Sequence, residues 1–172
     1  NKKYLSDKYN CHQGFADLFC YFYELGVMLL KRNGILSYIT SNSFLKAEYG
    51  LPLRKYLLQT STLLEIINIE DAQIFSDAIV NSSILTLTKN TNSNEKCLIV
   101  NRKYDLTIDF WNYIERNKFY YNQNDFDELP WSLIRPSILK LRNKIKGNNP
   151  TLEELNTRIR LGLATGSNEA FV

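Results

Sequence analysis

The sequence predicts an α/β fold, in which helices cover the faces of a β-sheet. Apolar residues recur at helical spacing in residues 16–31 and 53–59, the pattern of an amphipathic helix. Short apolar runs rich in strand-forming residues alternate with these segments and are bounded by polar turns, which is the pattern of buried strands. A chain that alternates in this way favours helices layered on a sheet.

The first predicted helix spans residues 16–31, and Gly34 follows its basic last turn, as at many helix ends. Asp17 and Glu24 lie seven residues apart on this helix, near one face, and we interpret them as a solvated pair. We expect the apolar residues of the helix to form a broad buried face. These residues are Leu18, Phe19, Phe22, Leu25, Met28, Leu29 and Leu30.

Four short segments are predicted strands: residues 35–40, 63–69, 83–88 and 97–100. The first is mostly apolar, as expected of a central strand covered on both faces. The second and third follow one another closely and need not be parallel. The polar loop between them, residues 70–82, carries one bulky side chain, Phe75. Residues 1–13 are polar and irregular, so they are predicted to be a surface loop.

The chain changes in character after residue 104. A helix is predicted over residues 105–116, and an aromatic and acidic stretch follows over residues 119–131. Pro136 is suited to the first turn of a further helix, which we expect to run to Lys146. Thr151 begins a capping-box pattern that predicts one more short helix.

The composition is that of an ordinary globular protein, with 44% hydrophobic and 23% charged residues. The net charge of +3 permits a polyanionic partner without requiring one. Four basic residues within positions 140–146 form a patch, and such a run is typical of a solvated helix face. The three cysteines form no C-x-x-C pair, which indicates reduced, structural thiols in a cytoplasm.

Several classes of function lack their residues in this chain. No apolar run is long enough to span a membrane, and no signal peptide is recognised, so we expect no membrane partner. The single histidine, His12, cannot build a zinc site alone, and we expect it to be exposed or locally hydrogen-bonded, with no metal bound. There is no G-x-G-x-x-G loop and no convincing nucleophile or general base. From the residues alone, the chain is half of an α/β domain.

Three segments, taken together, carry a resemblance. The first is residues 14–44, which contain Gly14-Phe15-Ala16-Asp17-Leu18-Phe19 and Ile39-Thr40-Ser41-Asn42-Ser43-Phe44. The second is residues 53–58 with 69–75 and 78–85, and the third is Gly162-Leu163-Ala164-Thr165-Gly166-Ser167-Asn168 with the residues up to Phe171. In this order and spacing they resemble the Taq-type adenine-N6-specific DNA methyltransferases and the related type IIG restriction–modification enzymes.

The resemblance implies the second half of a Rossmann-like sheet that binds S-adenosyl-L-methionine (SAM), followed by a mixed, mostly helical segment. It assigns residues 1–104 to the C-terminal half of the catalytic domain, 105–161 to a connecting segment and 162–172 to the start of a target-recognition domain. The expected activity is SAM-dependent methylation of adenine N6 at a specific site in double-stranded DNA, within a restriction–modification system. If the parent protein is a type IIG enzyme, a restriction endonuclease domain is fused to it further upstream.

The chain lacks the family's Asn/Asp-Pro-Pro-Tyr/Phe catalytic loop and its glycine-containing SAM loop. Both belong upstream of Asn1, which has no initiator Met before it. We therefore expect a piece of a longer protein that is inactive alone and needs the upstream half of the same polypeptide. Half a sheet exposes a strand edge, so we also expect self-association of the isolated piece.

The resemblance places Phe22 against the adenine of SAM, where a flat apolar ring gains stacking. The alternative is that Phe22 is simply part of the core. Asp17, Leu18 and Phe19 begin the same motif and are candidates to line the same pocket. Phe75 is the candidate to stack on the flipped target adenine, because methylation of a base in a duplex requires its extrusion. An isolated Phe75 that plugs the edge of the core is the alternative.

Candidate DNA contacts come from two regions. Ser41 and Asn42 follow the carboxyl end of a strand, where open α/β sheets bind ligands; loop polarity explains them equally well. The second region is the C-terminal turn with the two arginines before it, which are suited to phosphate contacts; a hinge between domains is the alternative. Its residues are Arg158, Arg160, Gly162, Thr165, Gly166 and Asn168.

Two other functions remain open at this stage. The same segments are compatible with a non-catalytic DNA-binding or scaffold module of a restriction complex. Because helix–strand patterns of this kind are common, a methyltransferase that acts on RNA or protein is a further alternative. The Thr165-Gly166-x-Asn168-x-x-Phe171 ending counts against that alternative.

Overall fold

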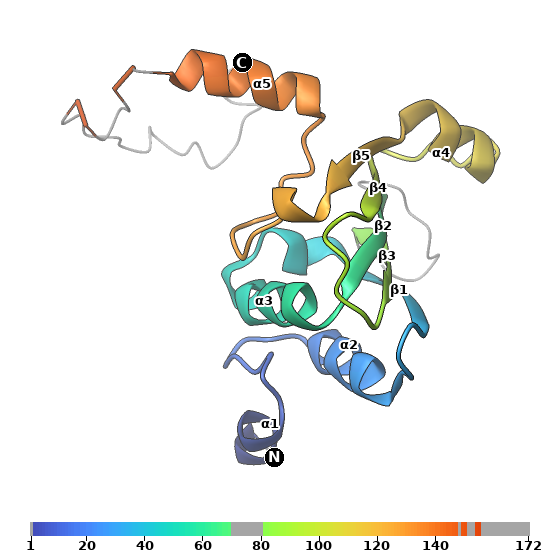
Figure 1. Ribbon diagram of the computed structural model, residues 1–172, viewed down its shortest axis with the longest axis vertical. Helices are drawn as coiled ribbons and strands as arrows, with labels where there is room; N and C mark the ends of the chain where they lie inside the picture. Colours follow the sequence, from blue (N-terminus) through green and yellow to red (C-terminus); the bar gives the residue numbers. More distant parts are fainter. Residues whose placement is uncertain (1, 70–80, 148, 151–153, 156–172) are drawn as a thin grey trace, which may run out of the picture. The chain divides into compact units, whose positions relative to one another are not determined.

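The computed structural model describes residues 2–69, 81–147, 149–150 and 154–155 (Figure 1). The chain divides into two compact units, Asn1–Arg135 and Pro136–Val172. The boundary lies inside the segment that was expected to connect two domains. The first unit contains all of the sheet, and the described part of the second unit is chiefly one helix.

The first unit is built on a five-stranded mixed sheet of order β1-β3-β2-β4-β5. Its strands are β1 (Ile35–Ser41), β2 (Thr62–Ile69), β3 (Ser82–Thr88), β4 (Lys96–Asn101) and β5 (Phe119–Asn122). β3 lies between β1 and β2 and is antiparallel to both, while β2 and β4 are parallel. β1, β2 and β4 therefore run in one direction, and their carboxyl ends share one edge of the sheet.

Five α-helices are described: α1 (Lys2–Lys8), α2 (Leu18–Leu29), α3 (Leu51–Thr60), α4 (Phe110–Asn117) and α5 (Pro136–Lys146). Short 3-10 turns, η1 (Asn42–Leu45), η2 (Glu48–Gly50) and η3 (Gln123–Asp125), join some of them to strands. Proline is placed in the first turn of α3, where its missing N–H costs no helical hydrogen bond. The side chain of Asp109 caps the amino end of α4 by accepting from the Asn112 N–H at 3.0 Å.

Alternate residues of the central strands feed two separate apolar clusters, one on each face of the sheet. Ile66 belongs to the larger cluster, which α2 and α3 cover, and its neighbour Ile67 belongs to the smaller one, which α4 covers. Ile99 and Val100 of β4 divide in the same way. This alternation is the period of two expected of a strand that is buried on both faces.

The main prediction is confirmed: the chain forms an α/β structure, and the four predicted strands correspond to β1–β4. The helices predicted at 16–31, 53–59, 105–116 and 136–146 correspond to α2–α5. α4 begins later than predicted because the carboxylate of Asp105 instead accepts from the N–H and hydroxyl of Thr107, forming a local turn. The short helix predicted from Thr151 lies outside the described residues.

Three local predictions were wrong. Residues 2–8 form α1 rather than a loop, and Phe119–Asn122 forms an edge strand that the aromatic, acidic composition did not reveal. The buried face of α2 is also different from the predicted one. Cys20, Tyr23 and Val27 face the core, while much of the expected apolar stripe is exposed, namely Leu18, Phe22, Met28 and Leu29. α2 packs against α3 and β1, so these neighbours, not hydrophobicity alone, select its buried face.

A tight crossing of backbone at Gly50 fixes the turn between β1 and α3. A Cβ atom at this position would lie 2.3 Å from the carbonyl oxygen of Phe44 and 2.8 Å from its Cα. Backbone atoms cannot move aside as the end of a long side chain can. Glycine is therefore required here for space.

We expect Gly50→Ala to lower the free energy of unfolding by about 3 kcal/mol, since overpacking against backbone forces a local shift. The thermal midpoint should fall by roughly 6–12 °C, measured by circular dichroism. Gly14→Ala is the matched control, because a Cβ at Gly14 meets nothing within 4 Å. Equal midpoints for the two variants would show that the crossing at Gly50 is not tight in solution.

Candidate functional site

The candidate site is the edge of the sheet where β1, β2 and β4 end. Ser41, Ile69 and Asn101 are the last residues of these three strands, and Ser82 begins the antiparallel β3 at the same edge. Open α/β sheets bind ligands outside the carboxyl ends of their strands, because loops of different strands converge there. The predicted DNA-contacting residues Ser41 and Asn42 lie at this edge.

A cluster of hydroxyl groups shapes the turn after β1. The Ser41 Oγ accepts from the Ser43 N–H at 3.3 Å and lies 2.9 Å from the Ser43 Oγ, so it caps η1. The Ser43 hydroxyl is in turn hydrogen-bonded to the Tyr49 hydroxyl. Burial raises the pKa of Tyr49, so its hydroxyl stays protonated at neutral pH. The Ser41 side chain is therefore engaged in the turn itself.

Three asparagine side chains form a relay of hydrogen bonds across the same edge. The Asn42 Nδ2 donates to the Asn68 Oδ1 at 2.8 Å, and the Asn68 Nδ2 donates to the Asn101 Oδ1 at 2.6 Å. The Asn101 Nδ2 then donates to the carbonyl oxygen of Leu133 at 3.2 Å. Asn68 is only 1% exposed, so the relay is a buried polar network whose members satisfy one another.

Asn42 also joins the two chain segments that border the β2–β3 connection. Its backbone N–H donates to the carbonyl oxygen of Asn81 at 2.8 Å, just before β3, and its side chain reaches Asn68 near the end of β2. The sequence indicated a polar residue at a strand end, and the structure shows that its hydrogen bonds are intramolecular. Phe75, the candidate for stacking on the target adenine, belongs to this connection and lies outside the described residues.

The proposed cofactor residues lie around the amino end of α2. Asp17 is the exposed N-cap residue, with no side-chain capping bond. Leu18 is 65% exposed and Phe22 is 56% exposed. Because they are four residues apart, they share one face of the helix. Phe19 points elsewhere and packs edge-on against Tyr23 and Phe44. Phe22 is thus not a core residue, while Phe19 is packed against the core.

The amino end of α2 lies close to the candidate edge. Tyr23, which follows Phe22, is fully buried and its hydroxyl lies 3.2 Å from the Thr40 Oγ1, one residue before the end of β1. Burial raises the pKa of the Tyr23 phenol, which keeps it neutral in the core. Phe22 is therefore an exposed aromatic ring carried by a helix turn that is fixed to the carboxyl end of β1.

Two buried charged residues were not found from the sequence. Glu24, interpreted as solvated, is fully buried and accepts hydrogen bonds from the backbone N–H groups of Asn10 and Cys11 and from the Asn10 side chain. The seven-residue spacing between Asp17 and Glu24 did not indicate that Glu24 is a buried hydrogen-bond acceptor. His12 is locally bonded as expected, with its Nδ1 2.8 Å from the Tyr21 hydroxyl.

Arg54 of α3 is 1% exposed and donates only to backbone carbonyl groups. Its Nη1 donates to Phe44 at 2.6 Å and to Ala47 at 3.1 Å, and its Nε donates to Glu128 at 3.0 Å. Burial lowers the pKa of the guanidinium. Its place on a predicted amphipathic helix gave no signal, because the acceptors are main-chain atoms that no sequence pattern reveals.

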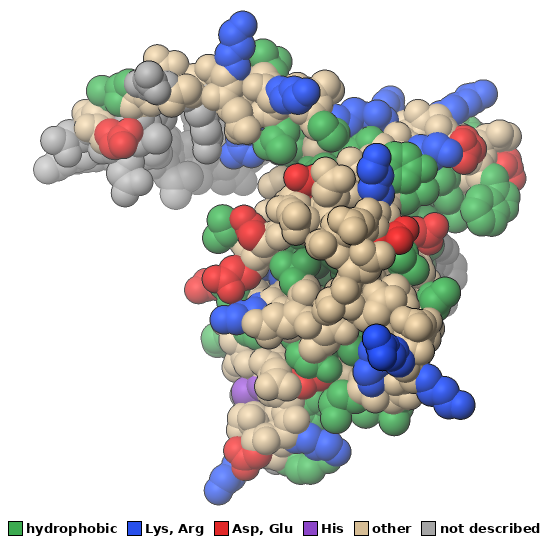
Figure 2. Space-filling model, viewed as in Figure 1, with side chains coloured by type: hydrophobic (Ala, Val, Ile, Leu, Met, Phe, Trp, Pro, Cys, Tyr) green, Lys and Arg blue, Asp and Glu red, His purple; other side chains and the backbone are tan. Residues whose placement is uncertain are grey.

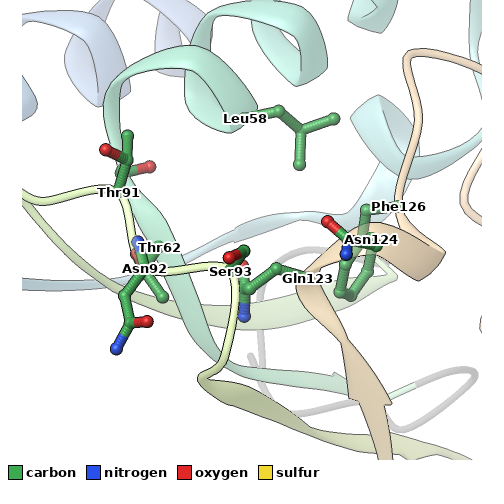
Figure 3. Close-up of a pocket in the computed structure, with 9 residues that line it drawn as sticks. Leu58, Thr62, Thr91, Asn92, Ser93, Gln123, Asn124 and Phe126 are labelled. Carbon is green, nitrogen blue, oxygen red and sulfur yellow. The ribbon is translucent and has the colours of Figure 1, made fainter.

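A hollow lies at the opposite edge of the sheet, at the amino end of β2 (Figure 3). Its volume is about 540 Å³ and all its lining residues are uncharged. Gln123 in its wall is already occupied: its Oε1 accepts from the Leu63 N–H and its Nε2 donates to the Leu63 carbonyl oxygen. Thr62 is likewise bonded to Asn90. The hollow therefore presents no unused buried polar group to a ligand.

The remaining predicted DNA-contacting residues lie outside the described residues; they are Arg158, Arg160, Gly162, Thr165, Gly166 and Asn168. Among the described residues, no group of three His, Cys, Asp or Glu side chains is placed to hold a metal ion. In the same part of the chain, no helix is long and apolar enough to cross a membrane.

The chain is similar to known methyltransferases of restriction–modification systems. Residues 1–75 match the family model of the Eco57I restriction-modification methylases. The chain is 31% identical over 168 residues to the type II methyltransferase M.AccI of Acinetobacter calcoaceticus, an alignment that covers 92% of this chain. The chain is a homologue of type II restriction–modification methyltransferases. A further homologue is the type II restriction enzyme and methyltransferase RM.Eco57I of Escherichia coli, 30% identical over 51% of this chain.

These homologues are much longer than the chain, which spans 30% of the length of M.AccI and 9% of RM.Eco57I. The fold also matches a solved structure from Vibrio vulnificus YJ016 that is provisionally described as a modification subunit of a type I restriction enzyme. The TM-score is 0.59 at 15% identity, over 83% of this chain and 37% of that one. The Rossmann-like methyltransferase fold expected from the sequence is thereby confirmed.

We expect Asn68→Ala to lower the free energy of unfolding by about 1–3 kcal/mol, because it leaves half-buried amide groups of Asn42 and Asn101 without partners. Urea unfolding followed by circular dichroism measures this loss. Asn112→Ala on the exposed side of α4 is the matched control and should change the free energy by less than about 0.5 kcal/mol. If both variants unfold at the same urea concentration, the relay does not contribute to stability.

Proposed function

We propose that this chain is part of a SAM-dependent, site-specific DNA adenine-N6 methyltransferase of a bacterial restriction–modification system, acting in the cytoplasm. The observation that carries the proposal is the homology to a type II methyltransferase over 92% of the chain. The chain supplies the later part of the catalytic sheet and leads into the recognition domain. It is inactive alone, because the catalytic Asn/Asp-Pro-Pro-Tyr/Phe loop and the SAM loop are not in its sequence.

The free edge of the sheet supports the need for an upstream half. β1 is the outermost strand on its side among the described strands. Its outward-facing Ile35 and Ile39 are 64% and 47% exposed. Apolar side chains beside an unpaired strand are normally covered in a finished protein. An upstream strand paired with β1, with its own helices, would cover them.

The residues at the amino end of α2 fit the adenine of SAM. Phe22 offers an exposed ring beside the carboxyl edge of the sheet, and Leu18 extends the same apolar face. A flat apolar ring buries the face of a purine and gains stacking with it. Asp17 is exposed at the N-cap of α2 and is available to a polar group of the cofactor. Phe19 packs against Tyr23 and Phe44, which supports a role in fixing this end of the helix rather than in contacting SAM. When bound, SAM supplies the methyl group.

The target adenine is extruded from the duplex before its amino group is methylated. Phe75 replaces the stacking that the flipped base has lost, as the resemblance to the family implies. The Asn/Asp-Pro-Pro-Tyr/Phe loop, which belongs to the upstream half of the polypeptide, accepts hydrogen bonds from the adenine amino group and polarises it. The Asn42 relay, which borders the β2–β3 connection on both sides, supports this placement by fixing the two chain segments from which the connection leaves.

The C-terminal turn contacts the DNA backbone, with Arg158 and Arg160 on phosphates and Gly162, Thr165, Gly166 and Asn168 in the turn. The side chains of Ser41 and Asn42 are hydrogen-bonded within the protein. These residues can therefore contact DNA only through their backbone, or after their side chains leave these hydrogen bonds. A fusion of the parent to a restriction endonuclease has a precedent in RM.Eco57I, which is named as both a restriction enzyme and a methyltransferase.

The test is methylation by the full-length protein. Incubated with SAM and double-stranded DNA, it should form N6-methyladenine at one sequence, detected by mass spectrometry of the digested DNA. Phe75→Ala should lower kcat/KM about 5- to 150-fold, the loss expected for roughly 1–3 kcal/mol of base stacking. SAM affinity should be unchanged.

Phe22→Ala should instead weaken SAM binding about 10-fold, measured by calorimetry, because it removes aromatic stacking on the cofactor. Trp111→Ala, which removes a ring that is 72% exposed on α4, is the control for both variants. Absence of methylated adenine in the wild-type reaction, together with retained DNA binding, would favour a non-catalytic DNA-binding or scaffold module of a restriction complex.

The isolated chain of 172 residues should self-associate through the free edge of β1. Ile39→Lys places a charge on the exposed apolar face of this strand and should shift the population toward monomer. Light scattering at increasing concentration measures the change. A strict monomer at high concentration would contradict the expected exposure of this edge.

A further inference from the structure

The net charge of the chain is distributed unevenly between its two units. Asn1–Arg135 contains 15 basic and 15 acidic residues, so its formal charge is zero, whereas Pro136–Val172 contains six basic and three acidic residues. The whole net charge of +3 therefore belongs to the second unit. Within that unit, four of the six basic residues lie on α5, which has no acidic residue.

Helical geometry divides these cations into two ridges. Lys140 and Lys144 are four residues apart and share one face of α5, and Arg142 and Lys146 share another. Between the two ridges runs an apolar stripe of Ile138, Leu141 and Ile145, spaced by three and four residues. Lys140, Arg142 and Lys144 are exposed and make no ion pair with any described residue. Figure 2 shows basic and apolar side chains next to one another on this helix.

The charge pattern selects the kind of partner. A solvated helix face normally mixes both signs, because opposite charges at i and i+4 support the helix. Here like charges stand four residues apart on both ridges, which destabilises an isolated helix slightly. Such repulsion is relieved when a polyanion neutralises it. The cations are also concentrated: α5 is about 16 Å long at 1.5 Å per residue and carries four of them.

We propose that α5 binds the phosphate backbone of the DNA substrate, independently of base sequence, and so holds the duplex on the enzyme. This inference rests on the proposed function, because it takes the polyanion to be the DNA that is methylated. The first unit, with no net charge, attracts the duplex little as a whole. α5 therefore provides a main electrostatic contact of this chain.

The experiment measures DNA affinity of the full-length protein as a function of salt. The triple variant K140Q/R142Q/K144Q removes three cations and keeps helix propensity, since glutamine and lysine are similar helix formers. Each lost phosphate contact lowers the slope of log K against log salt by about 0.9. We expect the slope to decrease by about 2–3 and the affinity at moderate salt to fall at least 10-fold, equally for specific and non-specific DNA.

The matched control is K31Q/R32Q/K96Q, which removes three exposed cations at the amino edge of the sheet. It should leave the slope unchanged, and the charge-preserving K140R/K144R should keep the wild-type slope. Wild-type binding with an unaltered slope in the triple variant would overturn the inference while leaving the proposed function intact. Loss of binding to phosphatidylglycerol vesicles in the triple variant, with DNA binding unchanged, would overturn it in favour of a membrane surface. Failure of the wild-type protein to bind or methylate DNA would refute the proposed function itself.

Discussion

The arrangement of the carboxyl edge depends on one buried cation. Among the described residues, Arg54 has no carboxylate partner within hydrogen-bonding distance, and the carbonyl oxygens of Phe44, Ala47 and Glu128 satisfy its guanidinium instead. Burying a charge is expensive unless hydrogen bonds replace its hydration. The backbone of three separate positions is therefore held where the charge requires it. Removing the arginine would leave the buried Phe44 carbonyl oxygen without this donor and would release the contacts to Ala47 and Glu128, so its effect would extend well beyond α3.

The consequence reaches the candidate site through the turn that Arg54 holds. Phe44 and Leu45 in this turn are fully buried, and the Leu45 carbonyl oxygen accepts from the Trp131 N–H at 2.7 Å. Ser41 and Asn42 lie immediately before the turn and are engaged in the hydroxyl cluster and the asparagine relay. The side chains that form these hydrogen bonds at the strand ends, those of Ser41, Asn42, Asn68 and Asn101, are uncharged. These side chains therefore contribute hydrogen bonds and shape to the candidate site, and none of them is a titrating acid or base.

The sequence was informative where local pattern decides the structure. Strand periodicity located β1–β4, and Pro136 and the polar loops located helix ends within a few residues. It was misleading where tertiary contacts decide. The end of α2 is an example: Lys89 of the neighbouring strand end donates to the carbonyl oxygens of Met28 and Leu30, so the helix is capped from a distance and not by its own basic last turn. β5 was missed because an edge strand of four residues carries too short a pattern.

The candidate site shows the same division. The position of Ser41 and Asn42 after a strand could be read from the sequence, but the direction of their hydrogen bonds could not, since Asn68 and Asn101 are 26 and 59 positions away from Asn42. The choice between a core and an exposed position for Phe22 also needed the structure. The seven-residue spacing placed Glu24 near Asp17. Residues 10–11, however, fold over Glu24 and leave Asp17 in solvent.

The three cysteines have a practical consequence of their position. Cys11, Cys20 and Cys97 are fully buried, and burial raises the pKa of each thiol, to about 12 for Cys20. A thiol reacts as its thiolate, so alkylating reagents should find none of them while the protein is folded. The three lie in the segment before α2, on α2 and on β4. The alkylation rate of each cysteine therefore reports how often its own region opens to solvent, and the three regions can be followed separately.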